Sequence, residues 1–192
     1  MRRFFLLQDE MTIKGRWHLG EIRLRSGLEP LLDAGHRLDA TEPLRGEVTH
    51  AGRILEFSLT SFNVPVATTE LANAVSSVAG RDVQCIPLEI AGQTGMFVLN
   101  SVRVIRCLDE ERAEFIKWTK QDHRSDLAGQ YRQITKHVLN ESALPNDAHF
   151  FRIEGSLVEL IVSDAVKAGM ESVGCLGAKF VEVPLSCSRS GA

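Results

Sequence analysis

The feature that most constrains the fold of this chain is its densest apolar run, at residues 148–183. Two stretches within it, 150–153 and 157–162, are rich in aromatic and β-branched residues, a composition typical of strands that are at least half buried. A third stretch, 178–183, has the same character and stops at Pro184, which cannot donate to a sheet ladder. The run is therefore predicted to supply core strands of a layered fold.

A helix is predicted between the second and third of these strands. Ser163 follows the strand directly, and its hydroxyl can accept a hydrogen bond from a free N–H of the first helical turn. Apolar residues at Val166, Met170 and Val173 recur at i, i+4 and i+7, so the helix Asp164–Ser172 has one apolar face. The segment then reads strand, strand, helix, strand.

A second amphipathic helix is predicted to begin after Thr68 or Thr69 and to end at Gly80. Its apolar residues recur at the same helical spacing: Leu71, Val75 and Val78. Most of the remaining chain between residues 54 and 107 alternates apolar and polar residues, which indicates half-buried strands. We therefore expect an α+β fold, with a mostly antiparallel sheet and a few short amphipathic helices packed against it.

The predicted organisation has three parts. Residues 1–52 form an N-terminal lobe of uncertain structure, 53–185 the main α+β domain, and 186–192 a flexible tail. A first strand is expected near Arg3–Leu7, because the apolar run there is shorter than the roughly 7 to 15 residues of a signal-peptide core. The rest of the lobe is rich in Gly and Pro, and loops and short elements are expected there.

Composition excludes several classes of protein. The formal net charge is −3, so no global field would draw the chain to nucleic acid or to an anionic membrane. No stretch approaches the roughly 18 apolar residues of a membrane span. Four cysteines, Cys85, Cys107, Cys175 and Cys187, show no C-x-x-C spacing and are expected to be reduced. These features predict a cytoplasmic protein.

No motif for a cofactor, a metal or a catalytic centre is evident. The six histidines are scattered singly, without the spacings that place two metal ligands on one helix face. The chain has no phosphate-binding glycine loop and no G-x-S-x-G nucleophile elbow. The carboxylates that follow Cys107 would raise its thiol pKa, which opposes a nucleophilic role. We therefore expect no enzymatic activity, no cofactor and no metal.

One local charge feature stands out, the acidic run at Asp109, Glu110, Glu111 and Glu114. It is either a solvated loop or first helical turn, or a patch that binds a basic protein partner. Trp118, just downstream, is either an anchor of such an interface or a core residue. We take these five residues as the candidate partner-binding site.

Four stretches together resemble a known family: DVQCIPLEI, FVLNSVRVIRCLDEERAEF, HFFRI and LIVSDAVKAGMESVGCLGAKFVEV. In this order they are similar to family eleven of the immunity proteins of bacterial polymorphic toxin systems, a myxobacterial-type domain. The resemblance covers Phe57–Val183 and is weak in the N-terminal quarter. Its marker positions are Asn100, Asp109, Phe151, Arg152, Ser163, Gly177 and Phe180.

This resemblance implies a non-enzymatic cytoplasmic protein that binds and neutralises a cognate toxin, and it supplies no catalytic residues. Two other hypotheses stay open. One is a small enzyme or ligand-binding module with a pocket near Cys107, Asp109 and His123. The other is a structural homodimer.

Overall fold

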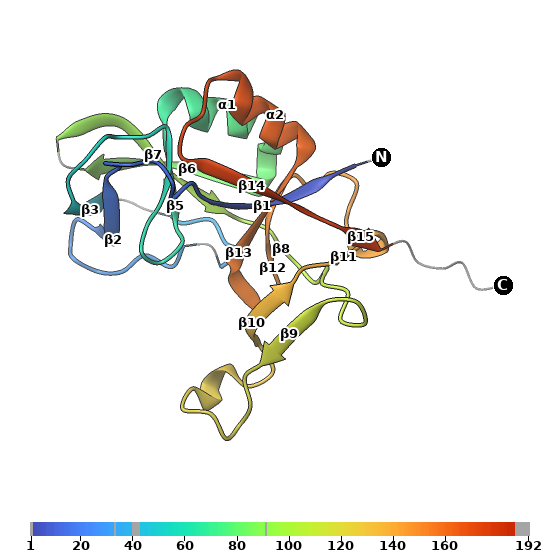
Figure 1. The fold of residues 1–192 in the computed structure, drawn as a ribbon. Helices are drawn as coiled ribbons and strands as arrows, with labels where there is room; N and C mark the ends of the chain where they lie inside the picture. The colour runs from blue at the N-terminus through green and yellow to red at the C-terminus, as the bar shows by residue number, and fades with distance from the viewer. Residues whose placement is uncertain (1, 33, 40–42, 91, 187–192) are drawn as a thin grey trace.

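The computed structural model describes the chain apart from residues 1, 33, 40–42, 91 and 187–192. Its strands are β1 (Phe4–Asp9), β2 (His18–Leu24), β3 (Leu44–His50), β4 (Phe57–Leu59), β5 (Pro65–Thr68), β6 (Val83–Ile90), β7 (Gln93–Ser101), β8 (Val104–Ile105), β9 (Glu114–Lys117), β10 (Tyr131–Lys136), β11 (Leu139–Asn140), β12 (Phe150–Ile153), β13 (Ser156–Ser163), β14 (Ala178–Val183) and β15 (Leu185–Ser186). Two α-helices, α1 (Thr69–Ala79) and α2 (Asp164–Ser172), lie side by side (Figure 1). Three single-turn 3₁₀ helices are η1 (Gly80–Asp82), η2 (Ser125–Leu127) and η3 (Glu141–Ala143).

Two large sheets form the body of the molecule. One has five strands in the order β14-β1-β13-β12-β8, and the other has six in the order β2-β3-β6-β7-β5-β4. Each contains one parallel pair, β12 with β8 and β3 with β6. The α+β class is confirmed, whereas the expectation of a mostly antiparallel sheet is corrected to two mixed sheets. Periodicity along one strand reports its buried face and says nothing about the direction of its neighbour.

Strand β1 shows why so many consecutive apolar residues are needed. It lies between β13 and β14, so both of its edges are hydrogen-bonded, and a hydrophobic core packs on each of its two faces. Phe5 and Leu7 point into one core, while Phe4 and Leu6 point into a second core on the opposite face. Because side chains alternate along a strand, four adjacent apolar residues can all be buried only between two such layers. The strand predicted near Arg3–Leu7 is thus confirmed.

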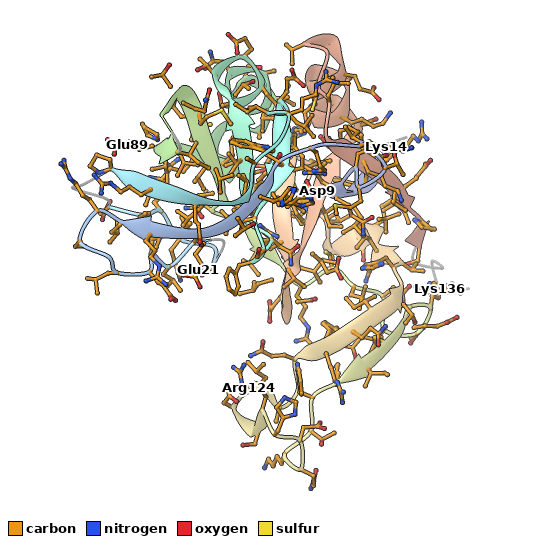
Figure 2. All side chains as sticks on the ribbon, turned by 60° about the vertical axis from the view of Figure 1, so that its left-hand side comes forward. Asp9, Lys14, Glu21, Glu89, Arg124 and Lys136 are labelled. Atoms are coloured by element: carbon orange, nitrogen blue, oxygen red, sulfur yellow. The ribbon has the colours of Figure 1, made fainter. Side chains whose placement is uncertain are left out.

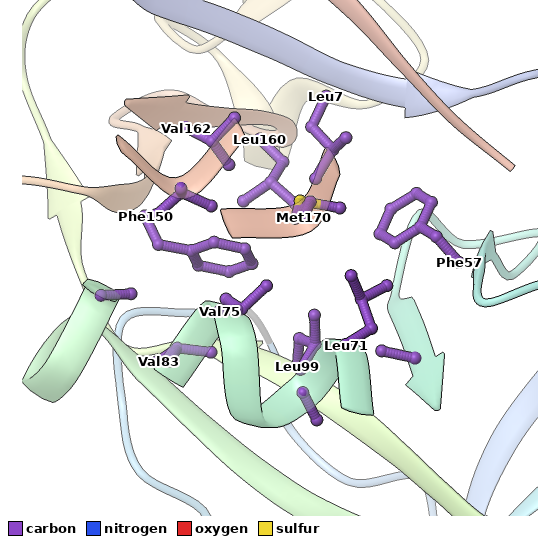
Figure 3. Packing of buried hydrophobic residues seen from close by; sticks show 14 of the residues in the cluster. Leu7, Phe57, Leu71, Val75, Val83, Leu99, Phe150, Leu160, Val162 and Met170 are labelled. Carbon is purple, nitrogen blue, oxygen red and sulfur yellow. The ribbon is translucent and has the colours of Figure 1, made fainter. Parts of the chain in front are cut away.

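The first core lies between the helices and the strands of both sheets (Figure 3). Leu71 and Val75 of α1 face Phe150 of β12 and Met170 of α2, and all four are fully buried. The helices are in contact at Gly169 of α2, where an added Cβ would lie 3.5 Å from the carbonyl oxygen of Ala74, an ordinary van der Waals distance. The helices thus join the two sheets.

Both predicted helices are confirmed at their expected positions. The Ser163 hydroxyl accepts from the Val166 N–H at 3.3 Å, as the N-cap pattern predicted. The predicted bounds of α1 are confirmed, but the predicted cap is not. Thr68 is the N-cap residue, and its side chain accepts no hydrogen bond from the first turn of the helix. Val173, assigned to the apolar face of α2, is exposed beyond its last turn.

The N-terminal quarter is more regular than expected. Strands β2 and β3 pair with each other, and β3 pairs with β6, so this region extends the six-stranded sheet. Most positions of β3 are exposed or half-buried, and they include Arg, Gly and Glu. The sequence of β3 therefore lacks the apolar alternation by which a strand is recognised. That the chain divides at residue 52 into an N-terminal lobe and a main domain stays a prediction. Of the predicted tail, Ser186 belongs to β15, and the rest, including Cys187, lies outside the described residues.

Helix length gives one further observation. None of the helices in the described part of the chain is both long enough and apolar enough to cross a membrane.

Candidate functional site

The site predicted from the sequence lies on an arm that projects from the body of the molecule. Strands β9 and β10 form an antiparallel ribbon, and residues 118–130 connect them at its far end (Figures 1 and 2). Near the loop end of the ribbon, the Tyr131 N–H donates to the Gly155 carbonyl, in the turn between β12 and β13. Arg124 marks the far end of the arm and Lys136 its other end (Figure 2). A protruding ribbon presents side chains that a partner can contact from several directions.

The acidic run lies at the base of this arm, in the turn before β9 and at the start of β9. Most of its carboxylates have a cation of the same chain beside them. Asp109 pairs with Arg112 at 2.8 Å, and Glu110 with Lys117 at 2.8 Å. Glu114 lies 3.7 Å from Lys136. Glu111 is exposed, and no cation among the described residues is within ion-pair distance of it.

These contacts change the electrostatics of the run. Hydrogen bonds from Ser186 and Arg112 hold the pKa of Asp109 below its ordinary value. Bonds from Lys117 and from the Tyr131 hydroxyl, the latter at 2.5 Å, lower the pKa of Glu110. Both groups stay ionised at neutral pH, but their fields are largely cancelled by the adjacent cations. The exposed charge available to a partner is therefore concentrated at Glu111 and Glu114.

Trp118 lies where the ribbon meets its end loop, and it is half-buried. His123 packs edge-on against its ring at 5.3 Å between centroids, and the Arg132 guanidinium lies 5.0 Å from its centroid. It belongs to none of the three large hydrophobic clusters of the described chain. The structure thus places Trp118 on the arm rather than in the core.

Concave surfaces flank the base of the arm on the acidic side. One, of about 720 Å³, is lined by Asp109, Glu110 and Arg112 together with Asn140 and Ser186. A second, of about 700 Å³, is lined by Glu111, Glu114 and Lys136. Both are open, and polar groups make up a large part of their surface, which suits a protein surface better than a small apolar ligand.

The pocket expected near Cys107, Asp109 and His123 does not form among the described residues. Cys107 is fully buried in the second core, and burial raises the pKa of its thiol to about 12. His123 contacts Trp118 on the arm, while Asp109 lines the 720 Å³ concavity without either of the other two. The three residues were close in sequence, but the arm separates His123 from the turn that follows Cys107.

Two other contacts bear on chemistry. His149 Nδ1 lies 2.9 Å from the Ser163 hydroxyl, which resembles a nucleophile and its base. That hydroxyl is buried and already accepts from the first turn of α2, so the pair caps a helix. Among the described residues, no group of three or more His, Cys, Asp and Glu side chains is arranged to hold a metal ion.

Sequence reasoning missed the residues that neutralise the acidic run. Lys117 lies in β9 together with Glu114. Tyr131 and Lys136 come from β10, and the pairing of β10 with β9 was not predicted. The sequence signal for this pair of strands was weak. Polar and apolar residues alternate on both sides of the loop 118–130, but the region is more highly charged than ordinary strands. Lys117 also lies 5.0 Å from the Tyr131 ring centroid.

Comparison with known proteins bears on identity. A family model described as "Immunity protein family (Imm11)" matches residues 91–184. The resemblance to an immunity-protein family is confirmed, and the matched segment contains the arm and all five predicted contact residues. Residues 57–90, which the resemblance also included, lie outside the match. No curated protein matches the chain.

Proposed function

We propose that this chain, whose residues 91–184 match the immunity protein family Imm11, binds a toxin protein and neutralises it in the cytoplasm. The family match carries this proposal. It is supported by the geometry of the matched segment, where carboxylates and an aromatic residue stand on a projecting arm rather than around a reactive centre. Neutralisation then works by covering the toxin's active surface, without chemistry performed by this chain.

The contact surface that we propose extends from the base of the arm, at Asp109, Glu110, Glu111 and Glu114, along β9 to Trp118, an aromatic anchor at the other end of the ribbon. Aromatic side chains surrounded by polar groups contribute strongly to interface affinity. Because Glu111 and Glu114 carry the least compensated charge, they would meet a basic surface of the toxin. Complementary charge of this kind accelerates association and selects the partner.

Co-expression tests the function directly. When the product of the adjacent gene is produced in a bacterial cell, growth should stop, and this chain should restore it and co-purify with that product. A neighbour that is not toxic, or a toxic one that neither binds this chain nor is relieved by it, would contradict the proposal. Light scattering on the purified chain alone tests the homodimer alternative in the same preparation.

Charge reversal tests the contact surface. Replacing both exposed acids, Glu111→Lys with Glu114→Lys, should weaken binding to that product by about 2 kcal/mol, roughly 30-fold, mainly through slower association. A titration by surface plasmon resonance at two salt concentrations measures both effects. The control variant, Glu70→Lys with Glu89→Lys, makes the same change in net charge at exposed positions on α1 and β6. Equal losses in the two variants would contradict the assignment of this surface.

A further inference from the structure

A concavity bordered by β2, the 60–64 turn and β13 has the features of a second, apolar contact site. It has a volume of about 300 Å³, and its apolar lining comes from Ile22 of β2, Leu32, Phe62 and Val64, and Leu157 and Val158 of β13. Phe62 is 65% exposed and Val158 58%, although both are large apolar residues. Leu28 and Leu31, beside the lining residues of the same loop, are also exposed. Exposed apolar residues gathered around one hollow mark an interaction surface.

The turn that carries Phe62 is held rigidly. The Thr60 hydroxyl accepts from the N–H groups of Phe62 and Val64, each at 3.2 Å. The Asn63 N–H donates to the Thr60 carbonyl, and the Thr60 N–H donates to the Val64 carbonyl, each at 3.0 Å. Asn63 adopts φ +59°, the left-handed region that is unfavourable for a residue with a Cβ. The backbone that carries the exposed ring is therefore positioned in advance, which lowers the entropic cost of using this turn in binding.

The buried guanidinium of Arg152 ties this turn to the family-matched segment. One of its amino groups donates to the Asn63 carbonyl at 2.9 Å, and the other to the Val158 carbonyl at 3.1 Å. Arg152 is 1% exposed and lines the base of the hollow. The hollow therefore combines residues inside the matched range with residues outside it, from β2 and the 60–64 turn. Such a surface can distinguish the partner of this chain from the partners of other family members.

Charge at the rim indicates the chemistry of the occupant. Glu21 and Glu29 both line the hollow. Glu21 is bonded to Arg23, at 2.8 Å from its Nε, and Glu29 interacts with the same arginine only through space among the described residues. An apolar side chain with a basic neighbour fits this arrangement. A second copy of the chain fits it poorly, because a symmetric contact at this hollow would bring the same acidic rims together.

We propose that this hollow is a specificity pocket that receives an apolar side chain, next to a basic residue, from a surface segment of the toxin. The inference rests on the proposed function, because it takes the toxin as the partner. It adds a second contact, distinct from the arm, in which shape and apolar burial determine which toxin is bound. Phe62 and Val158 are its apolar walls and Glu29 is its ionic contact.

Substitution in the pocket tests the proposal with the product of the adjacent gene as the probe. Phe62→Ala and Val158→Ser should each weaken binding by at least about tenfold, chiefly through faster dissociation. Glu29→Gln should give a smaller loss that shrinks as salt is raised. The matched control is Val181→Ser, a substitution of another exposed valine, on the edge strand β14. Circular dichroism confirms that each variant is folded.

The outcomes are distinguishable. If the unaltered chain binds and the pocket variants bind equally well, or Val181→Ser loses as much as they do, the pocket assignment is overturned while the proposed function stands. If the unaltered chain does not bind the probe at all, the proposed function fails, and the assignment of the pocket to a toxin fails with it.

Discussion

Replacing Gly177 by alanine should destabilise the protein by about 3 to 5 kcal/mol. This glycine, between α2 and β14, has φ +95°, and a Cβ built there would lie 2.1 Å from the Phe57 carbonyl oxygen. No side chain can rotate away to relieve that contact, because the obstructing atom belongs to the backbone. Either β4 or the start of β14 must move, and both border the helix-covered core. Urea unfolding followed by tryptophan fluorescence measures the loss.

Gly174 provides the matched control three residues earlier. Its φ is +72°, but an added Cβ would meet no atom within 4 Å. Gly174→Ala should therefore cost only the conformational penalty, about 1 to 2 kcal/mol. The difference between the two variants measures the close approach at Gly177 alone. Equal losses would mean that backbone conformation, rather than packing against Phe57, explains why glycine is needed at Gly177.

Residues 148–183 could be interpreted from the sequence because each element there has a local signal. Ser163 capping a helix and the apolar spacing of α2 are properties of a few neighbouring residues, and the cap was found as predicted, with Val166 and Met170 buried. Sheet order carries no such signal. Nothing near Phe4 indicates that β1 lies between β13 and β14, about 160 residues away in the chain, because that pairing is determined by the whole fold.

The candidate site shows the same limit. The sequence located the acidic run and Trp118, but the role of each carboxylate depends on which cation lies beside it. Lys136 and Tyr131 reach the run only because β10 folds back on β9. The charge of Glu114 is therefore partly compensated by Lys136, and Glu110 accepts a hydrogen bond from Tyr131, which no count of charges along the chain would reveal. Phe62 also escaped notice, because its exposure is a property of the turn that holds it.

Replacing Asp82 by alanine should cost about 3 kcal/mol, through a different mechanism. Asp82 is 1% exposed and ends η1, between α1 and β6. One of its oxygens accepts from Arg103 at 2.8 Å, and the other from the His149 N–H at 2.8 Å. Arg103 comes from the connection between β7 and β8, and His149 directly precedes β12. This single carboxylate therefore links the six-stranded sheet to the five-stranded one.

The expected loss has two parts. Without the carboxylate, the His149 N–H loses its acceptor, and a partly buried guanidinium loses its most buried partner. Arg103 keeps Asp147, at 2.9 Å, so its charge is not wholly uncompensated and the loss stays near the lower end of the range for such pairs. Asp126→Ala removes a two-point contact with Arg124 at the exposed end of the arm and should leave the unfolding midpoint unchanged. If Asp82→Ala behaved like Asp126→Ala, the ion pair would contribute nothing to stability, and apolar packing and other hydrogen bonds, such as that from the Leu59 N–H to Asp9 at 2.7 Å, would join the two halves of the fold.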